Sequence, residues 1–202
     1  MLEDGSVYEG TARGDFKETA CEIVFNTSMT GYVEILTDPS YAGQGVVMTY
    51  PMIGNYGIRE DFESERLQPS AFIVHELSSD PSNFRCTDTI ENLLKEYNIP
   101  CISGVDTRAV VKKLRESGTM RGVLTSDIGD RERLMDVIKS FRQIDLVGSV
   151  TAKQTKVYGE ENTGAEIALM DFGTKRNIIN NLVKRNCIVT VYPSFTSADE
   201  II

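Results

Sequence analysis

Apolar runs broken by turn-forming residues dominate the first 75 positions of the chain and predict short β-strands. β-Branched and aromatic residues gather at 6–11 (SVYEGT), 22–25 (EIVF), 46–50 (VVMTY) and 71–74 (AFIV). Turn signals stand between these runs, at Thr30-Gly31, Asp38-Pro39-Ser40-Tyr41, Gly43-Gln44-Gly45 and Gly54-Asn55. The N-terminal part is therefore expected to be rich in strands.

Helical spacing replaces this pattern from about residue 88 onward. Over 88–97 the apolar residues fall at i, i+3, i+4 and i+7, which places them on one face of a helix. Aspartate caps at Asp106 and Asp130 begin two further helices, and the first of these ends near Gly118. The inward faces of the three helices are expected to carry Ile90, Leu93, Leu94, Tyr97, Val110, Val111, Leu114, Leu134, Val137, Ile138 and Phe141.

A polar, aperiodic stretch at 151–164 predicts a linker between a first domain, residues 1–150, and a second that begins at residue 165. The second begins with a strand pattern at 166–170 (EIALM) and a helix pattern over 175–185. Another strand pattern follows at 187–192 (CIVTVY), and this order is typical of a βαβ unit with parallel strands.

The last residues indicate another helix, which begins with a capping box of Ser197 and Glu200. That helix has reached only Ile201 and Ile202 where the sequence stops. Two parallel strands and one helix cannot cover both faces of a sheet. We therefore expect residues 165–202 to be the truncated start of a larger α/β domain.

Composition narrows the class of protein further. The chain has 202 residues, of which 41% are hydrophobic and 25% charged, as in ordinary soluble proteins. It contains no apolar stretch of membrane-spanning length, and its N-terminus lacks the features of a signal peptide, so we expect a cytoplasmic protein. A net charge of −9 argues against a nucleic-acid partner, because phosphate binding needs a basic face.

Cysteine and histidine provide no catalytic or metal-binding pattern. The cysteines are widely spaced and are expected to be reduced thiols: Cys21, Cys86, Cys101 and Cys187. We predict that Cys101 is a buried structural thiol, because the sequence shows no motif that would pair it with a general base. The single histidine, His75, follows an apolar strand and is expected to be partly buried.

Two turns carry polar groups that could meet a ligand. In Asp38-Pro39-Ser40-Tyr41 the aspartate caps its own backbone, proline presets φ, and the Ser40 hydroxyl can point outward. The tripeptide Asp171-Phe172-Gly173 also occurs as a motif of protein kinases, but the other kinase motifs are missing from this sequence. We therefore interpret it as a tight turn between a strand and a helix. The backbone of Gly173 and Thr174 could hold an anion at that helix N-terminus.

Several long stretches line up, in order, with one protein family. They are 25–44 (FNTSMTGYVEILTDPSYAGQ), 48–58 (MTYPMIGNYGI), 82–85 (SNFR), 102–122 (ISGVDTRAVVKKLRESGTMRG) and 170–193 (MDFGTKRNIINNLVKRNCIVTVYP). The chain resembles the small, glutamine-hydrolysing subunit of carbamoyl-phosphate synthetase. The resemblance implies an α/β protein with a swivelling β/β/α N-terminal domain, followed by the first βαβ unit of a class I glutamine amidotransferase domain.

The family's chemistry defines what such a chain would contribute. Its amidotransferase domain releases ammonia from glutamine with a Cys nucleophile and a His–Glu pair. The ammonia passes to the large subunit, which makes carbamoyl phosphate with ATP for arginine and pyrimidine synthesis. The family's GxCxGxQ elbow has no match in this sequence, so no catalytic residue is assigned. No cofactor or metal is expected on this chain, since ATP and divalent metal belong to the large subunit.

The resemblance assigns one substrate contact, because in the family the serine of the DPSY turn reaches toward the glutamine pocket. Carried over, that residue is Ser40, whose hydroxyl can donate or accept without adding charge. Two alternatives remain. The chain could be a non-catalytic module that docks a protein partner, or a hydrolase using Cys101 and His75.

Overall fold

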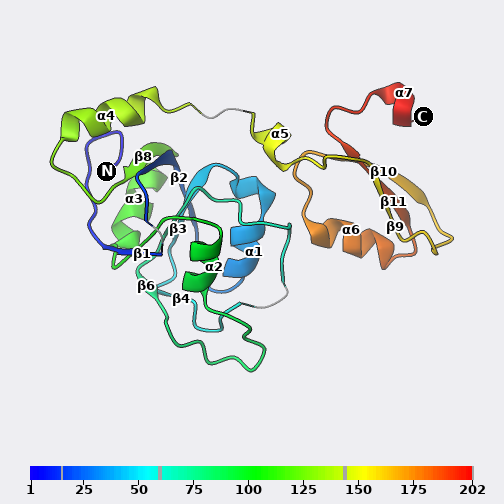
Figure 1. Cartoon of the computed structure of the whole chain (residues 1–202), viewed down its shortest axis with the longest axis horizontal. Helices are drawn as coiled ribbons and strands as arrows, with labels where there is room; N and C mark the ends of the chain where they lie inside the picture. The colour runs from blue at the N-terminus through cyan, green and yellow to red at the C-terminus, as the bar shows by residue number, and fades with distance from the viewer. Residues whose placement is uncertain (15, 59–60, 143–144, 202) are drawn as a thin grey trace.

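Two sheets organise the chain, one in a larger N-terminal part and one in a smaller C-terminal part (Figure 1). In this computed structural model the described residues are 1–14, 16–58, 61–142 and 145–201. The protein is thus a mixed α/β structure with a strand-rich N-terminal part, as the sequence predicts. None of the helices in these ranges is long and apolar enough to cross a membrane.

The larger sheet is mostly parallel. Its strand order is β1-β7-β5-β3-β2-β8, in which the four central strands run parallel and the two edge strands run antiparallel to their neighbours. A separate pair, β4 (Met52–Ile53) and β6 (Glu76–Leu77), lies beside it. The strands of the larger sheet are β1 (Thr11–Arg13), β2 (Thr19–Asn26), β3 (Gln44–Met48), β5 (Ala71–Ile73), β7 (Cys101–Ser103) and β8 (Met120–Leu124).

Helices cover both faces of this sheet. Neighbouring residues of a strand point to opposite sides, so they pack against different helices. Val46 and Phe72 are fully buried against α1 and α2, whereas Val47 and Ile73 pack against α3 on the other face. The helix α4 packs beside β8 through Leu134. The helices of this part are α1 (Tyr32–Thr37), the 3-10 helix Pro39–Tyr41, α2 (Ile90–Glu96), α3 (Thr107–Ser117), α4 (Arg131–Ser140) and α5 (Leu146–Val150).

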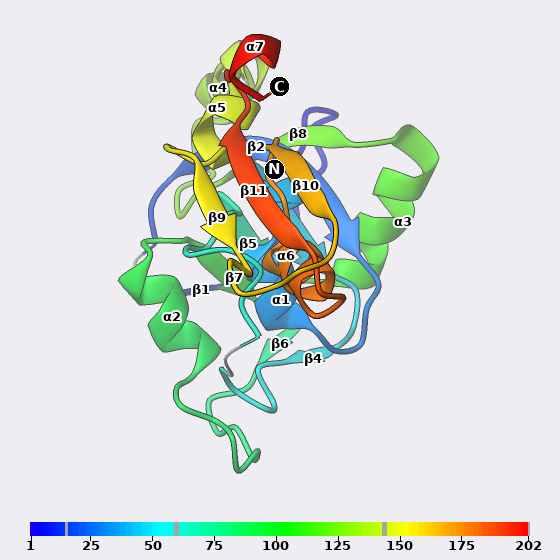
Figure 2. The same cartoon turned by 90° about the vertical axis from the view of Figure 1, so that its right-hand side faces the viewer.

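The smaller part contains the predicted βαβ unit. β10 (Glu166–Asp171) and β11 (Ile188–Pro193) are parallel neighbours, and α6 (Arg176–Val183) connects them. Figure 2 shows β9, β11 and β10 side by side in this sheet. The final helix, α7, spans Ala198–Ile201, and Ile202 lies outside the described residues. Its capping residue Ser197 donates from its hydroxyl to Glu200 at 2.8 Å.

One strand of the smaller sheet comes from the stretch expected to be a linker. Within 151–164, Lys156–Tyr158 forms β9, which pairs antiparallel with β11. The sequence did not predict this strand, because KVY is too short to show a period and is surrounded by polar residues. The division into domains at 150 and 165 stays a prediction.

The predicted helices at 88–97, 106–118 and from Asp130 are confirmed. Their caps form as expected, since Asp106 accepts from the Ala109 amide at 3.0 Å and Asp130 from the Arg133 amide at 2.9 Å. In contrast, the sequence did not predict α1 within the strand-rich region. Nearly every side chain of α1 is buried, so its pattern lacks a polar face and shows no helical period.

Several strand boundaries differ from the sequence prediction, most clearly at the run 6–11 and at the start of β3. Of the run at 6–11 only Thr11 lies in a strand, because residues 7–10 line an apolar cavity instead of pairing. The expected turn at 43–45 is confined to Gly43, whose φ is +75°, since Gln44 and Gly45 already belong to β3.

Core burial predicts a clear difference between two leucines. Leu94 in α2 is fully buried, whereas Leu146 in α5 is 36% exposed. We expect Leu94→Ala to lower the free energy of unfolding by about 2–5 kcal/mol, because it removes buried methyl groups and leaves a cavity. Leu146→Ala should cost about 1 kcal/mol or less. Urea denaturation of both variants tests this, and equal losses would contradict the proposed core.

Candidate functional site

The Ser40 turn is held by its own aspartate. Asp38 precedes the 3-10 helix Pro39–Tyr41, and its Oδ1 accepts from the Ser40 amide at 2.9 Å. Proline has no amide hydrogen, and the first position of a helix makes no use of one, so proline suits the start of this turn. The backbone of Ser40 is therefore fixed by the mechanism that the sequence predicts, and its side chain is exposed.

The other carboxylate oxygen of Asp38 reaches across to the C-terminal part of the chain. Its Oδ2 lies 2.7 Å from Nζ of Lys175, the residue that precedes α6. Asp38 is only 6% exposed, so the lysine provides the positive charge that this buried carboxylate needs. The hydrogen bond to Asp38 raises the pKa of Lys175 above its ordinary value. One aspartate thus links the Ser40 turn to α6.

Glu63 makes a second link and caps α6 from outside the helix. Its Oε2 accepts from the Asn177 amide at 3.0 Å, and its Oε1 accepts from Asn177 Nδ2 at 2.8 Å. Its backbone carbonyl accepts from the Arg176 amide at 2.8 Å. The first amides of a helix have no partner within the helix, and Lys175 provides no side-chain cap. A negative charge there is also favourable to the helix dipole.

Glu63 is connected to the Ser40 turn on its other side. Its amide donates to the Thr37 hydroxyl at 2.9 Å, and that hydroxyl donates to the Val33 carbonyl at 2.8 Å. Thr37 is fully buried at the end of α1, directly before Asp38. The N-terminus of α6, Glu63 and the Ser40 turn therefore form one continuous hydrogen-bonded structure.

The turn after β10 is tight, as predicted, and its aspartate is buried. Asp171 Oδ1 accepts from the amides of Gly173 at 3.0 Å and Thr174 at 2.7 Å, and its Oδ2 accepts from the Ala152 amide. The suggestion that the Gly173 and Thr174 backbone holds an external anion is therefore wrong. The protein's own carboxylate occupies those donors.

A glycine lets this turn approach the Ser40 turn. Gly173 has a φ of +101°, which favours glycine, and a Cβ at this position would lie 3.0 Å from Cβ of Pro39 and 2.9 Å from Cγ2 of Val150. The two turns are thus in direct contact across the junction between the two parts. We call this contact region, formed by Asp38, Pro39, Glu63, Gly173 and Lys175, the junction.

The Ser40 hydroxyl is available at the edge of the junction. Within the described part of the chain it makes no hydrogen bond, while its amide is fixed by Asp38. Its neighbour Tyr41 is held in place, because its hydroxyl accepts from Asn26 Nδ2 at 2.9 Å. An exposed hydroxyl on a rigid turn can donate to or accept from a polar ligand at little entropic cost.

Cys101 and His75 do not form a nucleophile and base. Cys101 is fully buried, and burial raises the pKa of its thiol to about 12, so it stays protonated near neutral pH. His75 is exposed rather than partly buried as predicted, because it lies beyond the carboxyl end of β5. Its Nδ1 lies 3.0 Å from the Val105 carbonyl, which can only accept, so Nδ1 carries the proton. The buried structural role predicted for Cys101 is confirmed.

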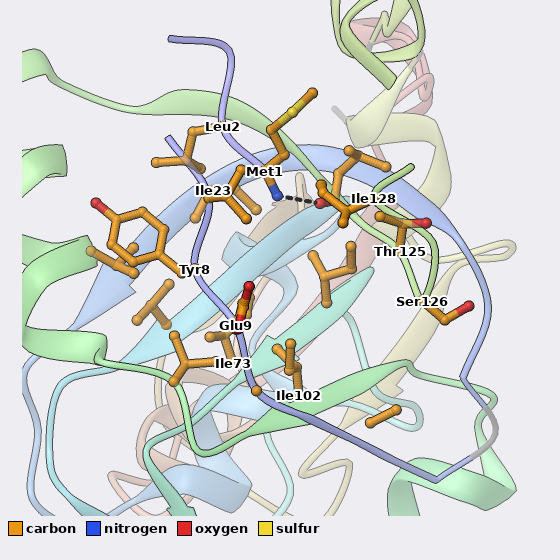
Figure 3. Close-up of a pocket in the computed structure, with 18 of the residues that line it drawn as sticks. Met1, Leu2, Tyr8, Glu9, Ile23, Ile73, Ile102, Thr125, Ser126 and Ile128 are labelled. Atoms are coloured by element: carbon orange, nitrogen blue, oxygen red, sulfur yellow. Dashed lines mark hydrogen bonds between the residues drawn. The ribbon is translucent and has the colours of Figure 1, made fainter. Parts of the chain in front are cut away.

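Other candidate sites offer less chemistry. An apolar cavity of about 410 Å³ lies beneath the N-terminal segment, with Glu9, Thr125 and Ser126 among its few polar lining residues (Figure 3). Among the residues that the structure describes, no three His, Cys, Asp or Glu side chains are placed to hold a metal ion. The four cysteines are free.

Sequence reasoning missed Glu63 and Lys175 as parts of this site. Glu63 lies in a polar stretch, DFESER, that shows no capping or turn signal. Its contact with Asn177 spans 114 positions, and Asp38 and Lys175 are similarly far apart. A sequence shows local caps directly, but it does not show that a carboxylate caps a helix more than a hundred residues away.

Comparison with known proteins identifies relatives along the whole chain. A family model described as carbamoyl-phosphate synthase small chain, CPSase domain, matches residues 1–124. The carbamoyl phosphate synthase small chain of Clostridium perfringens is 47% identical over 204 residues, which cover 100% of this chain and 58% of that one. The same protein of Listeria monocytogenes serotype 4b is 44% identical over 204 residues, covering 100% and 56%.

A third relative is similar to the same degree. The carbamoyl phosphate synthase small chain of Archaeoglobus fulgidus is 46% identical over 206 residues, covering 99% of this chain and 57% of its own length. The present chain spans little more than half the length of these relatives. The family resemblance drawn from the sequence motifs is confirmed.

The junction predicts that Gly173 tolerates no side chain. Gly173→Ala should lower the free energy of unfolding by roughly 2–4 kcal/mol, because the new Cβ combines an unfavourable φ with contacts to Pro39 and Val150. Gly5→Ala is a suitable control, since its φ is +84° and no atom lies within 4 Å of its Cβ position. Gly5→Ala should lower the free energy of unfolding by roughly 1–2 kcal/mol, the cost of the unfavourable φ alone. Similar losses in urea denaturation would contradict the close turn contact.

Glu63 is expected to stabilise the junction through its buried carboxylate. Glu63→Ala leaves the Asn177 amide without its acceptor and should cost roughly 1–3 kcal/mol. Glu65→Ala removes the same charge from an exposed side chain two residues away and should change stability by about 0.5 kcal/mol or less. Limited proteolysis near residue 176 reports the local effect, and equal cleavage rates in both variants would refute the cap.

Proposed function

We propose, on the premise that this chain belongs to the carbamoyl-phosphate synthase small chain family, that it acts within glutamine-dependent carbamoyl-phosphate synthesis. The chain supplies the N-terminal part of the small subunit. The complete small subunit hydrolyses glutamine and delivers ammonia to a large subunit. Its larger part is the family's swivelling β/β/α domain, and the unit of β10, α6 and β11 begins the amidotransferase domain. The catalytic Cys, His and Glu belong to residues outside this chain.

Within that enzyme, Ser40 is the contribution of this chain to the glutamine site. The observation that supports this role is its hydroxyl, which is exposed, makes no hydrogen bond within the described residues, and stands on a turn fixed by Asp38. The turn also lies against the start of the proposed amidotransferase domain of the same chain, through Lys175 and Gly173. A substrate held between two parts of one chain could then be contacted from both sides.

The rest of the enzyme supplies the remaining chemistry. The large subunit binds ATP and divalent metal, converts bicarbonate to an activated form and joins it to the ammonia, for arginine and pyrimidine synthesis. The free state of all four cysteines agrees with a reducing, cytoplasmic environment. This chain then needs no cofactor of its own.

Glutamine kinetics test the role of Ser40. In the intact synthetase we expect Ser40→Ala to raise the KM for glutamine about tenfold, with little change in kcat. The loss of one hydrogen bond worth about 1.4 kcal/mol corresponds to this factor of ten. Activity with ammonia in place of glutamine should not change, because ammonia bypasses the glutamine site. Ser126→Ala, at another exposed serine, is the control.

Unchanged glutamine kinetics in Ser40→Ala would contradict this assignment. They would favour the alternative of a non-catalytic docking module, for which the Ser40 hydroxyl has no substrate to contact. Equal loss of the glutamine and ammonia activities would instead indicate damage to the fold, and would also count against a specific contact.

A further inference from the structure

We propose that a hollow beside α3 docks an acidic, protruding surface of the large subunit, an inference that rests on the proposed function. The hollow has a volume of about 1180 Å³. One wall is the exposed side of α3, and the other is formed by residues that follow β2, β3 and β5, namely Thr27, Thr49 and His75. These three strands are parallel, so their carboxyl ends meet at one edge, where α/β sheets commonly bind partners and ligands.

The α3 wall carries an unneutralised row of positive charge. Arg108, Lys112 and Arg115 stand at i, i+4 and i+7 of α3 and are all exposed. In the part of the chain that the structure describes, their side chains form no ion pair, whereas Lys113 on the same helix pairs with Asp4 at 2.9 Å. The whole chain has a net charge of −9, so this local cationic row is opposite in sign to the rest of the protein.

The acidic residues of the hollow cancel this charge only in part. Asp106 accepts from the Ala109 amide at 3.0 Å at the start of α3, and Glu116 lies one residue beyond Arg115. Two carboxylates against three cations leave the α3 wall with an excess of positive charge. A cationic row on a helix is commonly just a solvated face, but here it forms the wall of a hollow.

Unused polar and apolar groups on the strand-end loops also indicate a partner. The Thr49 hydroxyl oxygen is buried and has no hydrogen-bond partner among the described residues. Met29 is 66% exposed, and Tyr50 and Met52 are 36% and 41% exposed. Met29 and Tyr50 lie on the loops that contain Thr27 and Thr49, and Met52 begins β4 directly after the second of these loops. Met, Tyr and Arg are enriched at protein interfaces.

The hollow fits a protein better than a small anion. Its volume exceeds the range of about 300–1,000 Å³ that is typical of small-molecule pockets. Apolar side chains of Phe25, Pro51 and Val111 line it together with the cations. A protruding segment that carries Asp or Glu beside apolar residues would match both features, with the charge guiding the encounter.

This position is compatible with a separate glutamine site. Ser40 lies shortly before the amino end of β3 at Gln44, and Thr49 follows its carboxyl end at Met48. The hollow and the Ser40 turn therefore lie at opposite ends of the same strand. A subunit docked in the hollow would leave the junction free to receive glutamine.

Charge reversal tests the docking face in the intact small subunit. For Arg108→Glu combined with Arg115→Glu, we expect the Kd for the large subunit to rise about tenfold or more at low salt. The dependence of Kd on ionic strength should also weaken, a change that mere loss of folding would not produce. The control is Arg131→Glu combined with Lys139→Glu, which makes the same charge change on exposed residues of α4 and should leave Kd within about twofold.

The outcomes separate this inference from the function on which it rests. Wild-type affinity in the α3 variant, or an equal loss in the α4 control, would overturn the docking face while leaving the proposed function intact. Failure of the unmodified subunit to bind a large subunit would overturn the proposed function, and this inference with it. A glutamine KM that is unchanged in the α3 variant supports the separation of the two sites.

Discussion

A carboxylate that leaves water must be matched by donors or by positive charge, and this constraint holds the two parts of the chain together. Asp38 and Glu63 are both buried at the junction. Asp38 is matched by Lys175, and Glu63 by the first amides of α6. Each acid belongs to the larger part and each of these partners to the smaller one, so both interactions form only where the two parts meet.

The same constraint orders the turn that carries Ser40. Asp38 binds the Ser40 amide with one oxygen and Lys175 with the other, so one side chain sets both the turn and its contact with α6. Glu63 adds a path through Thr37. With the backbone so constrained, the exposed Ser40 hydroxyl has little conformational freedom to lose when it meets a ligand. The geometry therefore suits a substrate contact made by a residue that carries out no chemistry itself.

Local signals predicted many of the elements, whereas elements that show no period of their own were missed. Aspartate caps and apolar spacing were enough for α2, α3 and α4, and alternating strand and helix patterns were enough for the unit of β10, α6 and β11. The helix α1 was not predicted because nearly all of its side chains are buried, which leaves it without a polar face. The strand β9 was not predicted because only its pairing with β11 makes it a strand. At the site, the Asp38 cap was visible in the sequence, whereas Glu63 acts across 114 positions.

The central proposal is that Ser40 contacts glutamine from a turn that is anchored to the start of α6. A crystal structure of the intact synthetase with a glutamine analogue that resists hydrolysis tests this most directly. The account predicts that Ser40 Oγ lies within about 3.2 Å of a polar atom of the analogue, while the Asp38–Lys175 pair remains formed. An analogue bound in the amidotransferase site with Ser40 Oγ more than about 5 Å from every ligand atom, beyond hydrogen-bonding range, would contradict it.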